Sequence, residues 1–530
     1  MNLSHLLISA ALLTSSLAAD GLDAGKLLQP ATDTWPSYNG DYSGRRYSSL
    51  AQINDSNVHT LGLAWVYRAT TGSFNPFGNQ VKSTPLEVNG VLYFTVPDHA
   101  WAVDARTGRE LWHYKWESKG GIHIGSRGVG IYGNWLYFET PDCHLISLNI
   151  KDGKERWNTE ICDLKQHYFG TVSPIIVRNH VIVGVSGDDL DVPGYLESRD
   201  PENGQLQWRW NTEPGKGEPG AESWPSEEAA AHGGGMTWMP GTYDPDLNLY
   251  YLGTGNPQPV MAGKGRGGDN LYTESLVALN PATGKMKWYF HPSPHDTHDW
   301  DAVQTPVLFD GDFNGRQRKL LAQASRNGYF FLLDRTNGEH LLTKPFIATN
   351  WAKEIDQRGR PMRDLKKDPA PDGALVSPAS DGATNWPPPS YDPQSGLFYV
   401  SAERSFSVFY LTDTGEKPEG WGGVDKNAYA ESYLRAIDYK TGDIRWTRKW
   451  EHEGNGLSGL LSTAGKLLFT GDPAGNFMAL DPATGETLWH VNLNATVANG
   501  PMTYELDGVQ YLVVGAGDSL WAFTLPHKLK

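Results

Sequence analysis

Apolar segments of strand length run along most of this chain, and a short polar turn interrupts them repeatedly. The repeated phrase is A-x-D-x-x-T-G-x-x-x-W. Asp or Asn opens a tight turn and Gly tolerates a positive φ, so each copy predicts a β-hairpin. Copies with the Trp span residues 102–112, 147–157, 198–208, 278–288, 436–446 and 479–489, and a copy without it spans 332–341.

An eighth copy is divided between the two ends of the chain. Ser519–Leu525 resembles the first half of the phrase, and Leu63–Tyr67 resembles the second half. Pairing the first strand with the last closes a ring and removes both sheet edges. We therefore expect an all-β fold, an eight-bladed β-propeller whose repeated Trp residues dock neighbouring blades, with roughly 60 residues per blade. Two polar, Pro-rich segments, 211–235 and 347–385, exceed what a blade needs and are expected to cap one end of the channel.

The first 19 residues have the pattern of a secretory signal. An apolar run, Leu6–Leu13, precedes the small residues Ser16 and Ala18, which predicts cleavage near Ala18/Ala19. The expected organisation is a signal peptide over 1–19 and one propeller domain over 20–530, located in the periplasm. No later run reaches the roughly 18 apolar residues of a membrane-spanning helix. The formal charge of -16 argues against nucleic acid and favours a basic partner.

Two cysteines, Cys143 and Cys162, flank the hairpin of the second repeat. Its turn near Lys151 places them nearly opposite each other on the paired strands. An exported protein can keep a disulfide, which we expect here, and two buried free thiols are the alternative. The sequence contains no C-x-x-C-H motif, so no c-type haem is attached covalently.

The stretch Pro294–Pro306 concentrates acidic groups: Asp296, Asp299 and Asp301 lie within it. If residues 299–301 are extended, the first and last carboxylates share a face and repel unless a cation lies between them. A hard cation with oxygen ligands would satisfy them and leave one carboxylate as a base. The alternative is an acidic surface loop over a buried Trp.

Two further stretches supply oxygen ligands. Asn256 lies in the Gly-rich turn G-T-G-N-P, and the apolar strand from Val181 ends at Asp188 and Asp189. If these groups converge in the channel with Asp299 and Asp301, they form an all-oxygen site for a calcium-like cation.

The motifs, taken in order on this repeat, resemble those of the quinoprotein alcohol dehydrogenases, which use pyrroloquinoline quinone (PQQ). They include W-P-S-Y-N-G-D from Trp35, H-G-G-G-M-T-W from His232, H-D-W-D from His298, R-N-G-Y-F-F-L-L-D from Arg326 and N-W-P-P-P-S from Asn385. The resemblance covers essentially the whole mature chain.

The resemblance implies a role for each matching position. Asp299 matches the catalytic base and Arg326 the cation near the reactive carbonyls of the quinone. The metal ligands would be Asp189, Asn256, Asp299 and Asp301, of which Asp301 matches the additional carboxylate of lanthanide-using members. The quinone-contacting positions are Arg127, Thr171, Ser186, Gly187, Trp238, Arg326 and Asn385, with Trp238 stacked under the ring.

Four positions depart from the family pattern. The adjacent Cys pair, expected near Gly121-Ile122, is absent. Lys82 replaces a common Glu, Leu457 replaces a common Trp, and Asp189 is one methylene shorter than the usual Glu. These departures concern the upper wall of the quinone site and the metal ligands.

The resemblance implies oxidation of a small primary alcohol to an aldehyde, with PQQ and one metal ion, a lanthanide favoured over calcium. Electrons would pass to a separate soluble cytochrome c, and a homodimer is left open. Two other functions stay open: a non-enzymatic propeller scaffold of the cell envelope, and a sugar-oxidising quinoprotein. Asp301 turning away to cap a loop is the alternative to its role as a ligand.

Overall fold

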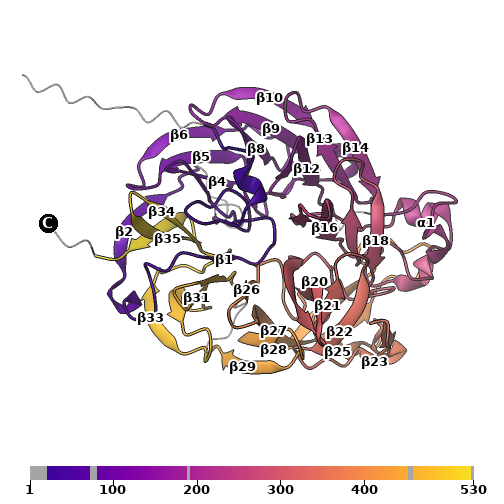
Figure 1. The fold of residues 1–530 in the computed structure, drawn as a ribbon. Helices are drawn as coiled ribbons and strands as arrows, with labels where there is room; N and C mark the ends of the chain where they lie inside the picture. Colours follow the sequence, from indigo (N-terminus) through magenta and orange to yellow (C-terminus); the bar gives the residue numbers. More distant parts are fainter. Residues whose placement is uncertain (1–20, 72–79, 188–190, 452–456, 527–530) are drawn as a thin grey trace, which may run out of the picture.

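The computed structural model describes residues 21–71, 80–187, 191–451 and 457–526. Within these residues, eight mostly antiparallel sheets form a ring around a central channel (Figure 1). This confirms the predicted eight-bladed propeller. The expected signal peptide, 1–19, and Asp189 lie outside the described residues.

The first four sheets follow the chain in order, each built from four consecutive strands. Their strands are β3 (Leu86–Val88), β4 (Val91–Val96), β5 (His99–Asp104) and β6 (Glu110–Lys115); β7 (Gly130–Tyr132), β8 (Trp135–Glu139), β9 (His144–Asn149) and β10 (Glu155–Glu160); β11 (Ile175–Val177), β12 (His180–Gly184), β13 (Tyr195–Arg199) and β14 (Leu206–Asn211); and β15 (Thr242–Asp244), β16 (Leu249–Gly253), β17 (Leu276–Leu279) and β18 (Met286–Phe290).

The next three sheets continue in the same way, and two of them gain an additional strand. They contain β19 (Val307–Phe313), β20 (Arg316–Ala324), β21 (Tyr329–Asp334) and β22 (Glu339–Pro345); β26 (Ser390–Asp392), β27 (Leu397–Leu411), β28 (Gly423–Asp438) and β29 (Ile444–Lys449), with β25 (Ala374–Val376) added to β27; and β30 (Leu461–Thr463), β31 (Leu467–Gly471), β32 (Asn476–Leu480) and β33 (Thr487–Asn492), with β1 (Tyr47–Ser48) added to β30.

The last sheet closes the ring. It combines β34 (Met502–Leu506), β35 (Val509–Ala516) and β36 (Ser519–Thr524) with β2 (Gly62–Arg68) from the other end of the chain. Val66 lies opposite Trp521 and Tyr67 opposite Leu520 in an antiparallel register. The predicted pairing of the two ends is confirmed.

The repeated phrase explains how neighbouring sheets are held. The Trp that ends the phrase in one sheet packs against the turn Gly of the next sheet. For example, a Cβ on Gly153 would be 2.7 Å from the Trp112 ring, so no larger residue fits there. Trp112 Nε1 also donates to Ile150 O of the same turn, 2.8 Å away. Gly153 has φ 68, as the turn requires. In the copy without Trp, Leu342 and Lys344 contact Gly442 instead.

The two long segments, which were expected to cap one end of the channel, lie in different places. Residues 211–235 contain η4 (Ala221–Ser223) and α1 (Glu227–Ala231), and α1 projects from the outer rim of the ring (Figure 1). Residues 347–385 form a separate hairpin, β23 (Ala352–Ile355) and β24 (Pro361–Arg363), followed by η6 (Leu365–Lys367) and β25. β25 anchors this second segment on the sixth sheet, His298 of the loop that carries Asp299 donates to Lys367 O, and Asp381 and Asn385 at the end of the segment reach the mouth of the channel.

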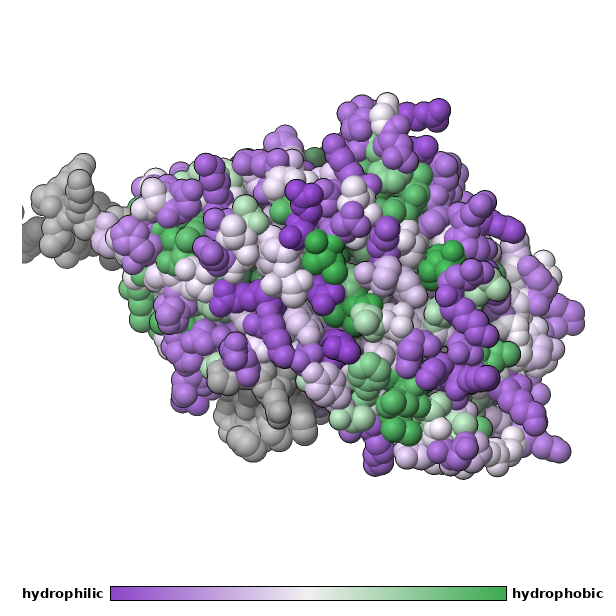
Figure 2. Space-filling model, turned by 90° about the horizontal axis from the view of Figure 1, so that it is seen from below, coloured by the Kyte–Doolittle hydropathy of each residue, from purple (hydrophilic) through white to green (hydrophobic). Residues whose placement is uncertain are grey.

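Short 3-10 helices complete the fold: η1 (Lys26–Leu28), η2 (Val58–Thr60), η3 (Leu164–Gln166) and η5 (Gly263–Arg266). No helix among the described residues is long and apolar enough to cross a membrane. The side of the ring in Figure 2 is mostly hydrophilic, with separate apolar groups between the polar ones.

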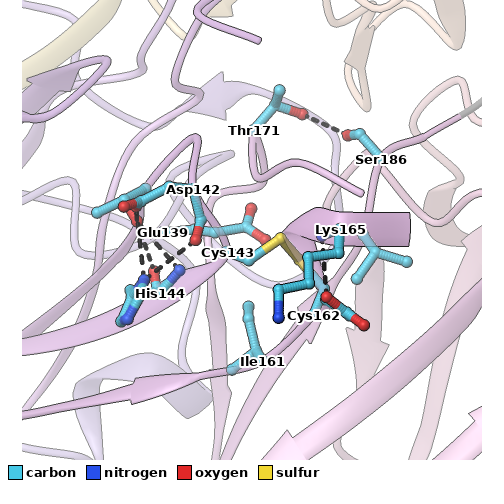
Figure 3. The surroundings of a disulfide bond; sticks show 12 residues. Glu139, Asp142, Cys143, His144, Ile161, Cys162, Lys165, Thr171 and Ser186 are labelled. Carbon is cyan, nitrogen blue, oxygen red and sulfur yellow. Dashed lines mark hydrogen bonds and ion pairs between the residues drawn. A yellow bond between two sulfur atoms is a disulfide. The ribbon is translucent and has the colours of Figure 1, made fainter. Parts of the chain in front are cut away.

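The two cysteines form the predicted disulfide. Cys143 and Cys162 are joined at the end of the β9–β10 hairpin (Figure 3). Ile161 N donates to Cys143 O beside the bridge. The bridge therefore fixes the start of the loop that carries Thr171.

We predict that Trp112→Ala lowers the free energy of unfolding by about 3 kcal/mol or more, because it removes a buried indole from between two sheets. Trp112→Phe keeps most of the packing and should lose only about 1 kcal/mol with the hydrogen bond. Urea unfolding of both variants measures this. A loss below about 0.5 kcal/mol for Trp112→Ala would show that the indole does not hold neighbouring sheets together.

Candidate active site

A cavity of about 470 Å³ lies at one end of the channel, where the loops before the first strand and after the second strand of each sheet meet. It brings together eight of the predicted site residues: Arg127, Thr171, Ser186, Trp238, Asp299, Asp301, Arg326 and Asn385. A larger cavity of about 770 Å³ lies around Asp244 and Arg335 and contains no predicted site residue in the part of the chain described.

The loop carrying Asp299 is shaped by Asp296. One oxygen of this buried carboxylate, Oδ2, accepts from the backbone N–H groups of His298, Asp299 and Trp300 at 3.0, 2.8 and 3.1 Å. The resulting turn holds Asp299 at φ 68, in the left-handed region. The extended conformation considered for residues 299–301 does not occur at Asp299, because Asp296 gathers three backbone N–H groups into a turn.

The two carboxylates nevertheless converge, and a cation lies between them. Arg326 Nη2 donates to Asp299 Oδ2 and Arg326 Nη1 to Asp301 Oδ2, both at 2.8 Å. Burial alone would lower the pKa of Arg326, but Asp299 and Asp301 raise it above its usual value. Arg326 therefore remains charged and holds both carboxylates toward the cavity.

Asp301 is more deeply enclosed than Asp299. Besides Arg326, it accepts from Trp238 Nε1 at 2.9 Å and from the backbone N–H of Asn256 at 2.6 Å. Burial raises the pKa of this carboxyl, although Arg326 opposes the shift. Trp300 lies under the loop, fully buried, and donates to Ala379 O. The carboxylates are buried as well, so this is not an acidic surface loop.

The donor set fits a hard cation. Asn256 Oδ1 is buried and accepts no hydrogen bond in the described part of the protein, so it has a lone pair available beside Asp301. As the side chains lie here, no three His, Cys, Asp or Glu groups among the described residues are gathered to hold a metal ion. Arg326 instead holds Asp299 and Asp301. The residues that would complete a cation site are these two carboxylates and the Asn256 amide oxygen.

The other side of the cavity is cationic and aromatic. The guanidinium of Arg127 lies 4.6 Å from the centroid of the Trp238 ring and 5.4 Å from that of Trp386. Lys82 donates to Ile124 O at 2.7 Å, and burial lowers the pKa of Lys82 to about 8. These cations, with the indole face of Trp238, fit a flat polyanionic cofactor.

The remaining predicted cofactor positions surround this cationic region. Thr171 and Ser186 share a hydrogen bond of 3.0 Å at the cavity wall (Figure 3). Asn385 Nδ2 donates to Asp381 O at 2.9 Å. Gly187, at φ 151, adjoins Ser186 but does not line the cavity.

The absence of the Cys pair has a steric basis. A Cβ on Gly121 would lie 2.0 Å from Pro141 O, so the loop of residues 119–124 accepts no side chain at that position. This loop is held by Asp142, whose Oδ2 accepts from Lys119 N, and by the His123–Asp98 pair at 2.6 Å. Ile124, at its end, and Leu457 form part of the cavity wall.

Sequence reasoning missed three residues of this region. Asp381 and Trp386 line the cavity, and Glu274 is fully buried near Asp296 and Asp301. Trp386 follows Asn385 in the N-W-P-P-P motif, so the motif that identified Asn385 could also have identified Trp386. Nothing in the sequence around Glu274 distinguished it. Burial raises the pKa of Glu274 well above its usual range.

Residues 35–345 match the family model described as glucose/ethanol/alcohol dehydrogenase, beta-propeller domain. Residues 430–525 match a second model, outer membrane protein assembly factor BamB. The chain is 35% identical to the quinoprotein alcohol dehydrogenase PedH of Pseudomonas putida, over 99% of this chain and 97% of the relative. It is 31% identical to a 1-butanol dehydrogenase (cytochrome c) of Thauera butanivorans, over 91% of this chain and 74% of the relative.

Solved structures agree with these relatives. The quinohemoprotein alcohol dehydrogenase ADHIIG of Pseudomonas putida HK5 is similar with a TM-score of 0.88 and 30% identity, covering 97% of this chain and 84% of that chain. A europium-containing methanol dehydrogenase is similar with a TM-score of 0.83 and 28% identity, covering 94% of this chain and 99% of that chain.

We predict that Asp296→Ala lowers the free energy of unfolding by about 2–4 kcal/mol, because three backbone N–H groups lose a charged acceptor. Asp296→Asn keeps an acceptor and should cost less. Although burial opposes it, the hydrogen bonds from His298 and Trp300 hold the pKa of Asp296 below its usual value.

The contribution of Asp296 is therefore present above its unfolded pKa, about 3.9, and is lost as the pH falls through the lower folded value. Urea unfolding between pH 3 and 7 measures the difference between wild type and variant. A difference that stays constant over this range would contradict the assigned charge.

Proposed function

Because this chain belongs to the PQQ-dependent quinoprotein alcohol dehydrogenase family, we propose that it oxidises a small primary alcohol to the aldehyde with one bound metal ion at the Asp299–Asp301 site. The observation that carries the proposal is the pairing of Arg326 with both carboxylates beside the indole of Trp238. In this proposal Asp299 is the base, Arg326 the fixed cation and Trp238 the aromatic floor, and all three line one cavity.

A bound PQQ would supply the acceptor for the hydride of the alcohol carbon, and a bound cation would supply Lewis-acid polarisation. Asp299 takes the proton of the alcohol hydroxyl at a carboxylate oxygen, so loss of proton and hydride together leaves the aldehyde. Arg326 orients Asp299 and, because it stays charged, stabilises negative charge that develops in the cavity. Trp238 forms the apolar floor that excludes water.

The cofactor would lie between Trp238 and the cations of the opposite wall. Arg127 and Lys82 would pair with its carboxylates, and Thr171, Ser186 and Asn385 would supply neutral hydrogen bonds. Gly187 would allow close backbone approach beside Ser186. Lys82, in place of the common Glu, adds positive charge to this wall.

A lanthanide is proposed as the preferred ion, with calcium as the alternative. Asp189, Asp299 and Asp301 would supply three carboxylates and Asn256 a neutral oxygen. Coulomb attraction grows with the charge of the ion, and the carboxylates repel one another when it is absent. The similarity to a europium-containing methanol dehydrogenase supports this choice.

Location and electron acceptor complete the proposal. Residues 1–19 would direct export to the periplasm, where the propeller of residues 20–530 would reduce a soluble cytochrome c. The charge of -16 suits a basic cytochrome, and one relative carries cytochrome c in its name.

The similarity to the BamB model is confined to residues 430–525, away from Asp299 and Arg326, so the enzyme is favoured over a scaffold. Relatives named for alcohols favour an alcohol over a sugar.

We predict that Asp299→Ala lowers kcat by about 10³-fold with either lanthanum or calcium, because the proton acceptor is lost. Asp301→Ala should keep turnover with calcium and lower the lanthanum-to-calcium ratio of kcat/KM by about tenfold or more, because one negative ligand is lost. Steady-state oxidation of a primary alcohol by PQQ-loaded protein, with each ion added separately, measures both effects. Full activity with calcium alone, unchanged in Asp301→Ala, would contradict the lanthanide assignment.

A further inference from the structure

Glu139 is a buried carboxyl that the proposed reaction does not use. It is the last residue of β8 and is 1% exposed. Its Oε2 accepts from the backbone N–H of Val172 at 2.5 Å, and the backbone of Thr171 hydrogen-bonds the same carboxyl. Glu139 therefore holds two successive peptide groups of the loop 169–172, which forms part of the cavity wall.

The loop 169–172 packs directly on Glu139. A Cβ on Gly170 would lie 2.5 Å from Glu139 Cγ and 2.3 Å from Thr140 O, so no side chain fits between them. At the start of the loop, Phe169 and Ser186 exchange two backbone hydrogen bonds of 3.1 and 3.0 Å. The loop is thus attached to the end of β8 on one side and to Ser186 on the other.

Thr171 connects this loop to the cationic side of the cavity. Its carbonyl oxygen accepts from Arg127 N at 3.1 Å and from Arg127 Nη1 at 3.4 Å. Its hydroxyl shares the 3.0 Å hydrogen bond with Ser186 (Figure 3). The guanidinium of Arg127 lies over the Trp238 ring. A shift of the Thr171 peptide would therefore move the guanidinium and the hydroxyl together.

We propose that Glu139 is a positioning residue for the cofactor: by holding the peptides of the loop 169–172, it sets the positions of the Arg127 guanidinium and the Thr171 hydroxyl that would contact a bound quinone. This rests on the proposed function, since it requires PQQ in the cavity. The strand itself does not need the carboxyl, because β8 is paired with β9 through its backbone.

The role of Glu139 is that of a hydrogen-bond acceptor and does not require a charge. Burial raises the pKa of Glu139 well above its usual range, although Arg127 opposes the shift. The oxygen of an amide accepts from N–H groups as that of a carboxyl does. Gln is therefore the conservative replacement, whereas Met, of similar length, would leave two buried N–H groups without their acceptor.

The test compares Glu139→Gln with Glu139→Met. The matched control is Glu87→Met: Glu87 is also buried, in β3, and accepts from the backbone N–H of Gly90 at 2.7 Å, but it does not line the cavity. Affinity for PQQ is measured by quenching of Trp fluorescence with lanthanum present, and thermal unfolding without PQQ measures the stability of each variant.

We expect Glu139→Met to weaken PQQ binding by about tenfold, because the cavity wall loses the acceptor that fixes it. Glu139→Gln should stay within about twofold of wild type, since it keeps an acceptor. Glu87→Met should lower the unfolding temperature but leave the affinity for PQQ unchanged.

A double variant separates positioning of Arg127 from general loosening of the fold. When Arg127→Met has removed the guanidinium, adding Glu139→Met should weaken PQQ binding by less than about threefold more, because the group to be positioned is gone. The full tenfold loss in that background would overturn the inference.

Failure of the inference can be told from failure of the proposed function. If wild type binds PQQ and Glu139→Met binds it equally well, only the inference is overturned. If wild type does not bind PQQ, the proposed function fails and the inference with it. If Glu139→Met does not fold, Gly170→Ala replaces it, because the added Cβ would push the loop off Glu139. Unchanged PQQ affinity in Gly170→Ala would then overturn the inference.

Discussion

Pairing of the first and last strands is the constraint on which the rest of this structure depends. The register of β2 with β36 closes the ring, so that every sheet has two neighbours and no long edge remains open. Closure gathers loops from distant parts of the chain at one mouth of the channel. Arg127, Trp238, Asp299, Arg326 and Asn385 meet there although no short sequence segment contains them. The Trp–Gly contacts between sheets keep these loops at fixed distances.

Opposite charges line the two walls of the channel mouth. One wall carries Arg127 and Lys82, which suit an anionic cofactor, and the other carries Asp299 and Asp301 around Arg326. Asp299, Asp301 and Asp381 line this side and together exceed the single positive charge of Arg326. A bound cation would balance this side, and a polyanionic quinone would balance the other. The arrangement therefore links the metal and the cofactor electrostatically, with Trp238 between the two walls.

The fold was predictable because its signals are local. Asp or Asn and Gly define each turn, the Trp spacing identifies each sheet, and the positions of Cys143 and Cys162 follow from the hairpin between them. For the site, the sequence allowed prediction of which residues take part, but not of how the backbone positions them. The left-handed backbone of Asp299 was missed because it depends on three N–H groups sharing Asp296. Glu274 was missed because a carboxyl becomes unusual only when folding removes its water and its partners. The paths of the two long segments could not be predicted in full, since β25 anchors one of them to the sixth sheet while its end reaches the channel mouth.

The most direct test of the account is a single turnover without any electron acceptor. Purified protein, reconstituted with PQQ and lanthanum under anaerobic conditions, is mixed with excess primary alcohol while quinone absorbance and aldehyde are recorded. We predict that the bound quinone is reduced completely and that one aldehyde forms for each PQQ. Stable quinone absorbance and no aldehyde, with lanthanum and again with calcium, would contradict the assignment as an alcohol dehydrogenase.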